Sequence, residues 1–281
     1  MKNAVQRIIL FAIAIPGFTF LILLVPHYHY LWLTLLLVLV GIQSGIELRA
    51  MMANIAPSLP LWTIFIPGAA PVLSWLAIAG LIDVSLTVLC LTCGLIWAFG
   101  GLAFLPENSF SSGVQRLASR LMIIIYPGYF IWWIHAISGL PDARTALFVF
   151  MLTIFLNDSA AWLFGMLFGR HRGLFAVSPN KSIEGFIAGV LTSTLIIMAS
   201  SWFFPALLPH PNWQLLLGGT VLGISIPIGD LTESALKRAV GVKDSGHIMP
   251  GRGGMLDSID SILFAAPLYV IFIRLGGYSL A

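Results

Sequence analysis

Long apolar runs dominate this chain, and short polar connections separate them. Nine runs approach the roughly 20 residues that a helix needs to cross a bilayer core, at 8–25, 30–48, 61–81, 84–105, 117–140, 145–169, 183–208, 213–235 and 257–275. These runs do not show the alternation of apolar and polar residues that is typical of membrane β-strands. The pattern therefore predicts an all-α integral membrane protein with about nine transmembrane helices.

The composition agrees with a membrane protein. Of the 281 residues, 59% are hydrophobic and 9% are charged, whereas soluble domains have about 45–50% apolar and about 25% charged residues. We expect a single membrane-embedded domain, 1–281, with N-terminal helices for packing or lipid contact in 1–116 and catalytic helices in 117–281. The net charge of +3 is mild and dispersed, which excludes nucleic acid as a main partner.

The positive charges predict an orientation, because cytoplasmic loops carry the excess of Lys and Arg. In the nine-helix arrangement twelve of the 14 Lys and Arg residues lie on one side, with only Arg144 and Arg274 on the other. We therefore expect a cytoplasmic N-terminus, with the longest polar connections, 170–182 and 236–256, also in the cytoplasm. No A-x-A-like site follows the run 8–25, so we expect a first helix instead of a cleaved signal peptide.

Acidic residues concentrate in the C-terminal part of the chain, which is where we expect any chemistry. Seven of the 11 are found there, at Asp158, Glu184, Asp230, Glu233, Asp244, Asp257 and Asp260. A charged side chain inside a membrane costs at least about 2.5–3.5 kcal/mol, so it usually faces an interior cavity or a partner.

The spacing of these residues suggests a cation site. Asp230, Glu233, Ser234 and Lys237 follow the i, i+3, i+4, i+7 pattern of one helix face, and Asp257 with Asp260 form a second i, i+3 pair. Such carboxylates beside Lys and Arg suit Mg²⁺, which takes one or two carboxylates and completes its shell with water and phosphate oxygens. Spacing alone leaves open that these charges pair with one another in helix-end salt bridges.

A glycine-rich turn precedes the last predicted helix. It reads Pro250-Gly251-Arg252-Gly253-Gly254, and such a turn lets backbone N–H groups approach an anion. A plain membrane-surface turn would use the same residues, so the turn alone decides nothing.

Several motifs in the second half of the chain resemble those of the phosphatidate cytidylyltransferase family. One block runs from Ser234-Ala-Leu-Lys237-Arg238 through Lys243-Asp244 and the glycine-rich turn to Asp257 and Asp260. Gly229-Asp230-Leu231 with Glu233-Ser234 precedes it. A second block holds Asn157-Asp158-Ser159-Ala160-Ala161-Trp162 and Ser178-Pro179-Asn180-Lys181-Ser182-Ile183-Glu184-Gly185. The resemblance covers roughly 120–260.

The resemblance implies transfer of a cytidylyl group from CTP to phosphatidic acid, which gives CDP-diacylglycerol and pyrophosphate with the help of Mg²⁺, with a second cation left open. By position in the motifs, Asp230 and Asp257 are the metal ligands, and Lys237 and Lys243 join them as catalytic residues. The remaining motif positions imply substrate contacts at Asp158, Ser178, Lys181, Glu184, Arg238, Asp244, Arg252, Gly253, Gly254 and Asp260. The partners implied are CTP, phosphatidic acid and the bilayer, with the site on the cytoplasmic face of the cytoplasmic membrane.

Two positions depart from the family pattern and keep alternatives open. Arg252 stands where the family usually has His, and Ser258 stands where it usually has Arg. A CTP-dependent enzyme acting on a different lipid or isoprenoid phosphate is therefore an alternative. An ion or proton transporter is a further one, although it would need polar residues across the whole membrane, and here they cluster on one side.

Small residues and the remaining polar groups point to packing. Gly165-x-x-x-Gly169 and Gly219-x-x-x-Gly223 permit close helix contact, around the site or in a homodimer. We expect His135, which follows two Trp residues, to be an interfacial or a hydrogen-bonded structural residue. We expect Cys90 and Cys93 to be buried apolar thiols on one helix face.

Overall fold

A computed structural model of the chain describes residues 17, 19–22, 25–173, 175–249, 251 and 253–276. In this part of the chain the ordered elements are helical, and the only β-type pairs are the isolated bridges Arg172–Ser182 and Met249–Gly253. Eight described helical segments are long and apolar enough to cross a membrane: His27–Met52, Leu61–Ile78, Val84–Ala103, Ser109–Gly139, Ala143–Phe168, Ile183–Phe203, Asn212–Ala239 and Leu256–Leu275. The prediction of an all-α integral membrane fold is confirmed.

These eight segments match eight of the nine predicted runs, while most of the first run, 8–25, lies outside the described residues. Several helix ends differ from the prediction, and two of them have a clear local cause. Helix α8 (Ile183–Phe203) stops before Pro205, because the residue preceding a proline disfavours the helical conformation. Helix α9 (Asn212–Ala239) continues past 235, so Lys237 and Arg238 belong to its last turn. Basic residues are favourable there because they face the negative end of the helix dipole.

The chain forms two compact units. Among the described residues, the first contains those of His27–Ala136 and Ala239–Ser258, and the second contains those of Ile137–Arg238, those from Ile259 onward and those of Ile15–Pro26. The expected division into 1–116 and 117–281 stays a prediction.

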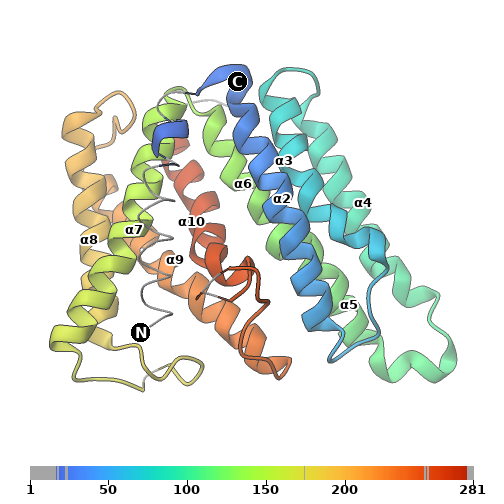
Figure 1. Cartoon of the computed structure of the whole chain (residues 1–281). Coiled ribbons are helices and arrows are strands. Elements are labelled where there is room, and N and C mark those ends of the chain that lie inside the picture. The colour runs from blue at the N-terminus through green and yellow to red at the C-terminus, as the bar shows by residue number, and fades with distance from the viewer. Residues whose placement is uncertain are drawn as a thin grey trace. The chain divides into compact units, whose positions relative to one another are not determined.

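The first unit is built from α2 (His27–Met52), α3 (Phe65–Ile78), α4 (Val84–Ala103), α5 (Gly113–Ile123) and α6 (Phe130–Ala136), with short helical turns η1 (Leu61–Ile64) before α3 and η2 (Glu107–Ser112) before α5. Helix α3 packs against both α2 and α6 (Figure 1). The buried His135 ring joins the three helices, with nitrogen atoms 2.8 Å from the Thr34 hydroxyl and 3.1 Å from the Ser74 hydroxyl. The prediction of a structural, hydrogen-bonded His135 is confirmed.

Between α5 and α6 the helix widens into a π-helical turn, η3 (Ile124–Tyr129). Pro127 lies inside this turn, and proline has no N–H to donate to the preceding turn of an α-helix. The wider turn keeps the segment helical in spite of the missing hydrogen bond, so Ser109–Gly139 remains one membrane-length segment.

The second unit contains η4 (Ile137–Gly139), α7 (Ala143–Phe168), α8, α9 and most of α10 (Leu256–Leu275). Helix α7 packs along α8 (Figure 1). The buried Asn157 amide of α7 donates to the Ser193 hydroxyl at 2.8 Å and to the Gly223 carbonyl at 3.1 Å, which links α7, α8 and α9. The Tyr269 hydroxyl of α10 donates to the Ala146 carbonyl of α7 at 2.9 Å.

Small residues let α8 and α9 approach closely, as the Gly-x-x-x-Gly pattern predicts. A Cβ atom at Gly223 would lie 2.8 Å from the Val190 Cα atom and 3.0 Å from the Val190 carbonyl oxygen. Both contacts are to backbone, which cannot move away as a flexible side chain could. The contact between the two helices therefore depends on glycine at this position.

We expect Gly223→Ala to destabilise the protein by about 1–3 kcal/mol, because the added methyl group pushes α8 and α9 apart. The measurement is thermal unfolding of the purified protein in detergent. Gly100→Ala is the matched control: no atom lies within 4 Å of a Cβ at that helical position, so stability should stay within about 1 kcal/mol of wild type. Equal melting temperatures for the two variants would contradict the packing described above.

Candidate functional site

The connection between α9 and α10, residues 240–255, is folded around the carboxylate of Asp257; we call it the signature loop. Asp257 lies in the first turn of α10. Its Oδ2 atom accepts hydrogen bonds from the Ser245 amide at 2.9 Å, the Ser245 hydroxyl at 2.8 Å and the Gly254 amide at 2.7 Å. A motif residue predicted to bind metal thus also organises the loop that carries the motif.

A second carboxylate, which the sequence reasoning missed, supports the same loop. Glu47 of α2 is 3% exposed. Its Oε1 atom accepts from the Met255 amide at 2.8 Å and the Gln43 amide at 3.0 Å, and its Oε2 atom accepts from the Leu256 amide at 3.0 Å and lies 3.0 Å from the Ser245 hydroxyl. The signal was an acidic residue inside an apolar run, but nothing local connects it with a loop about two hundred residues away.

Glycines of the loop make room for these carboxylates. A Cβ atom at Gly254 would lie 2.5 Å from Glu47 Oε2 and would also clash with the Ser245 hydroxyl. Gly253 has a φ angle of 105°, which side-chain-bearing residues rarely adopt, and a Cβ there would lie 2.6 Å from Asp257 Oδ2. The predicted glycine-rich turn therefore packs against the carboxylates of Glu47 and Asp257. Gly253 and Gly254 are needed because a side chain at either position would occupy the space of these carboxylates.

The other predicted residues of this loop are more accessible. Lys243 and Asp244 are exposed, and Arg252 lies outside the described residues. The Ser258 hydroxyl, which stands where the resembling family usually has Arg, donates to the Gly254 carbonyl at 3.1 Å. The signature loop thus exposes the Lys243 side chain to solvent, while its interior is ordered by hydrogen bonds to the Asp257 and Glu47 carboxylates.

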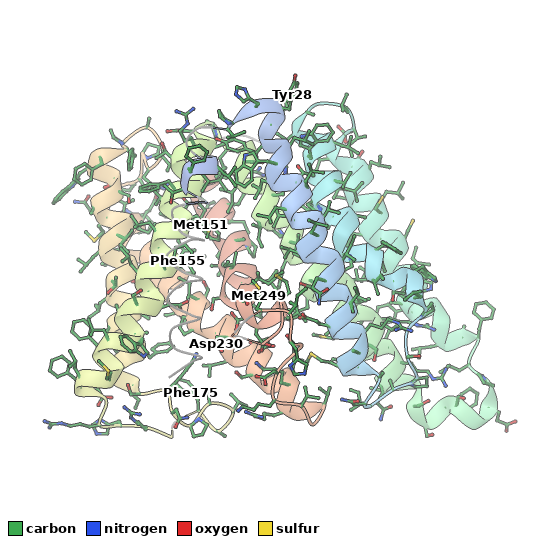
Figure 2. The ribbon with its side chains drawn as sticks, in the orientation of Figure 1. Tyr28, Met151, Phe155, Phe175, Asp230 and Met249 are labelled. Atoms are coloured by element: carbon green, nitrogen blue, oxygen red, sulfur yellow. The ribbon has the colours of Figure 1, made fainter. Side chains whose placement is uncertain are left out.

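In the second unit, Asp230 on α9 pairs with Lys181 from the connection between α7 and α8. The Lys181 Nζ atom lies 2.5 Å from Asp230 Oδ2, and the two side chains are 29% and 39% exposed. Ser234 contacts the other carboxylate oxygen at 3.5 Å. Figure 2 marks Asp230 on α9 and Phe175 on the same α7–α8 connection. The structure therefore brings together two predicted site residues that are far apart in sequence.

A second ion pair lies one turn further along α9. Lys237 pairs with Glu233, and the Glu233 side chain is 1% exposed. The predicted helix face of Asp230, Glu233, Ser234 and Lys237 is confirmed, and so is the open possibility that its charges pair with one another. Arg238, in the same last turn, is exposed.

The α7–α8 connection is held at both of its ends. Glu184 in the first turn of α8 accepts a hydrogen bond from the His171 amide at 3.2 Å, and its Oε1 lies 2.6 Å from His171 Nδ1. The Ser182 hydroxyl caps α8 by accepting from the Gly185 amide at 3.1 Å. Ser178 is partly exposed between these anchors. Glu184 thus anchors the loop on which Lys181 lies.

Two further predicted residues differ in their surroundings. Asp158 is exposed on α7, whereas its neighbour Asn157 is buried and donates to the Ser193 hydroxyl. Asp260 is 6% exposed. A Cβ at Gly229 would lie 2.5 Å from the Asp260 carbonyl oxygen, so the glycine before Asp230 lets α9 approach the backbone of α10.

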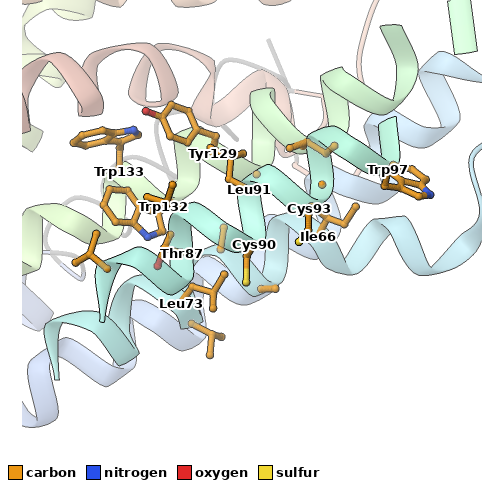
Figure 3. A pocket seen from close by; sticks show the side chains of 18 of the residues that line it. Ile66, Leu73, Thr87, Cys90, Leu91, Cys93, Trp97, Tyr129, Trp132 and Trp133 are labelled. Carbon is orange, nitrogen blue, oxygen red and sulfur yellow. The ribbon is translucent and has the colours of Figure 1, made fainter. Parts of the chain in front are cut away.

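A cavity of about 830 Å³ in the first unit is unsuited to phosphate chemistry (Figure 3). Apolar and aromatic side chains of α3, α4 and the η3–α6 segment line it, including Trp97, Trp132 and Trp133, and no charged residue is among them. Cys90 and Cys93 contribute to this lining but are exposed, so the prediction of buried thiols was wrong. Helix α4 buries little of its surface, which leaves both thiols on an apolar outer face.

The carboxylates of Asp230, in the second unit, and of Asp257, in the first, are the kind of oxygen ligand that suits a hard cation. Within the described part of the chain, no three His, Cys, Asp or Glu side chains gather as a metal cluster. Mg²⁺ is commonly held by one or two carboxylates, with water and phosphate oxygens filling its other positions. Asp230 and Asp257 each offer oxygen ligands of this kind.

These features define a membrane-embedded helical protein with carboxylates and cations at helix ends and in the adjoining connections. The model of the cytidylyltransferase family matches residues 5–276. The chain therefore belongs to the cytidylyltransferase family, and the resemblance in its motifs is confirmed.

Individual relatives agree with this assignment. The phosphatidate cytidylyltransferase of Staphylococcus epidermidis RP62A is 40% identical over 170 residues, and that of Staphylococcus aureus COL is 38% identical over 170 residues. Each match covers 60% of this chain and 63% of the relative. The uncharacterized protein YnbB of Escherichia coli K12 is 46% identical over 132 residues, 47% of this chain and 43% of that protein.

The Lys181–Asp230 pair should contribute little to stability, because partly exposed ion pairs are screened by solvent. In a double-mutant cycle with Lys181→Met and Asp230→Asn, we expect a coupling free energy of about 1 kcal/mol or less. Unfolding of the four proteins in detergent without substrate measures it. A coupling well above that value would mean that the pair is structural and not readily exchanged for a ligand.

Proposed function

We propose that this protein transfers the cytidylyl group of CTP to phosphatidic acid, giving CDP-diacylglycerol and pyrophosphate. The observation that carries the proposal is the family match along nearly the whole chain, joined to motif residues that lie at helix ends and in polar connections. The names of the staphylococcal relatives support the same reaction.

The chemistry requires an in-line displacement at phosphorus. A phosphate oxygen of the lipid forms a bond to the α-phosphorus of CTP, and the bond from that phosphorus to the bridging oxygen breaks, so pyrophosphate leaves. No general base is needed, because a phosphate monoester with a second pKa near about 6 is already anionic at neutral pH. The protein's task is to position both substrates and to neutralise charge.

Cations on the two connections are suited to hold phosphates. Lys181 and Lys243 have accessible side chains, and Arg238 is exposed at the end of α9. Such groups donate charge-assisted hydrogen bonds to phosphate oxygens. In this proposal Lys237 and Arg252 add to the positive potential of the site, and Ser178, Glu184, Asp158, Asp244 and Asp260 shape or border it.

Asp230 and Asp257 are the residues we propose to hold Mg²⁺. When bound, the ion would neutralise charge on the transferring phosphoryl group and on pyrophosphate. Asp257 presents a carboxylate already oriented by three hydrogen bonds. Asp230 has a partner, Lys181, that a ligand can displace at low cost.

The surroundings suit a lipid acceptor. The acyl chains of phosphatidic acid would stay in the bilayer beside the apolar helices, while the headgroup meets the polar connections. Since CTP is a cytoplasmic nucleotide, we propose that these connections face the cytoplasm from the cytoplasmic membrane. The distribution of Lys and Arg supports this orientation.

The first test is formation of CDP-lipid and pyrophosphate by the purified protein with CTP, phosphatidic acid and Mg²⁺. We expect activity in wild type, loss of activity on removal of divalent metal, and a fall of at least about 100-fold in Asp257→Asn, because charge stabilisation at phosphorus is lost. Glu107→Gln makes the same kind of change at an exposed residue of η2 outside the site and should leave the rate unchanged. Wild type that binds CTP without turning over any lipid phosphate would contradict the proposal.

A different acceptor is the second candidate, and the two departures at Arg252 and Ser258 favour considering it. Labelled CTP should be offered with phosphatidic acid and, separately, with isoprenoid phosphates. We expect phosphatidic acid to be preferred by at least about tenfold, an energy difference of about 1.4 kcal/mol. If an isoprenoid phosphate is preferred, Arg252→His with Ser258→Arg tests whether these two positions set the choice.

A further inference from the structure

The first unit contains a buried carboxylate, Glu47, that none of the motifs includes. Both of its oxygen atoms are surrounded by donors: Oε1 accepts hydrogen bonds from two N–H groups, and Oε2 accepts one from an N–H group and lies 3.0 Å from the Ser245 hydroxyl. A carboxylate saturated by donors in this way cannot also offer an open position to a metal ion or a phosphate. Glu47 therefore acts on the protein's own backbone.

The donors identify what Glu47 holds. Two of them are the Met255 and Leu256 amides, where α10 begins. The first N–H groups of a helix have no partner within the helix, and the helix dipole favours a negative charge there. Glu47 thus fixes the start of α10, immediately before Asp257.

Ser245 connects the two carboxylates. Its hydroxyl lies 3.0 Å from Glu47 Oε2 and 2.8 Å from Asp257 Oδ2, while its amide donates to Asp257 Oδ2 at 2.9 Å. Gly246 packs so closely that a Cβ there would lie 2.7 Å from Glu47 Oε1. Glu47 therefore contacts Ser245 near the start of the signature loop and the Met255 and Leu256 amides at its end. These residues in turn set the position of the Asp257 carboxylate.

We propose that Glu47 is a positioning residue for the signature loop and, through it, for the Asp257 carboxylate. This inference rests on the proposed function only in its consequence for Mg²⁺, since the ordering of the loop is a property of the chain alone. Outer-shell groups that orient a metal ligand typically change metal affinity or activity by about 10–100-fold when they are removed.

Hydrogen exchange of the purified full-length protein in detergent tests the ordering without substrate. In Glu47→Gln, one acceptor oxygen becomes an NH₂ group, which cannot accept from a backbone amide. We expect the Ser245, Gly254, Met255 and Leu256 amides to exchange about tenfold faster or more than in wild type, which corresponds to about 1.4 kcal/mol. Glu107→Gln, an equivalent change at an exposed site, should exchange as wild type does. Unchanged exchange in Glu47→Gln overturns the inference.

Activity then tests the consequence for the site. We expect Glu47→Gln to raise the Mg²⁺ concentration for half-maximal rate by about 10–100-fold, with partial recovery of the rate at saturating Mg²⁺. A rate that falls only in proportion to the folded fraction, with an unchanged Mg²⁺ requirement, would mean a structural role alone and would overturn the inference.

Ser245→Ala provides a second route if Glu47→Gln does not fold. It removes the hydroxyl between the two carboxylates and keeps the contacts of Glu47 with Met255 and Leu256. We expect a smaller shift of the Mg²⁺ requirement in the same direction, and no shift would count against the inference. If wild type is inactive but its signature loop exchanges slowly, the proposed reaction is refuted while the ordering of the loop by Glu47 still stands. Failure of the proposed reaction and failure of this inference therefore give different results.

Discussion

The backbone N–H groups at the start of a helix must find acceptors, and at the start of α10 two carboxylates provide them. Glu47 binds the Met255 and Leu256 amides, and Asp257 binds the Gly254 and Ser245 amides. An unsatisfied buried amide costs about 1–3 kcal/mol, so these groups cannot be separated from their acceptors cheaply. The glycines and the small hydroxyl side chain of the signature loop follow from this need, because larger side chains would occupy the space of the carboxylates.

In the second unit, close helix packing places the polar residues. Gly219 and Gly223 bring α9 against α8, and Gly229 brings it against the backbone of Asp260. Asp230 follows directly after this last contact, while Lys181 lies on a connection whose ends are held by Glu184 and Ser182. Packing at several small residues thus brings Lys181 and Asp230 together. The ion pair itself contributes little to the stability of this packing, because both side chains are partly exposed.

Hydropathy and length were enough to predict the helices, because a bilayer permits few other ways to satisfy the backbone. The predicted ends failed where a local effect decided them: Pro205 stops α8 early, and the Glu233–Lys237 pair with the basic last turn extends α9. The face of α9 was predictable from spacing, since helical neighbours are fixed by geometry. Glu47 was not, because its partners in the signature loop are contributed by a segment about two hundred residues away, and no local pattern reports such a contact.

The two ion pairs of α9 differ in the free energy needed to break them. Lys181 can therefore leave its carboxylate partner more easily than Lys237 can. Lys181 and Asp230 are both partly exposed, so water can replace either partner at little cost. Glu233 is buried, so taking Lys237 away would remove a cationic partner from a buried carboxylate, which costs more than breaking an exposed pair. In the reaction proposed here, Lys237 would therefore stay paired with Glu233 and contribute a fixed positive charge. In the reaction proposed here, Lys181, Lys243 and Arg238 would contact the phosphates directly, because their side chains are accessible.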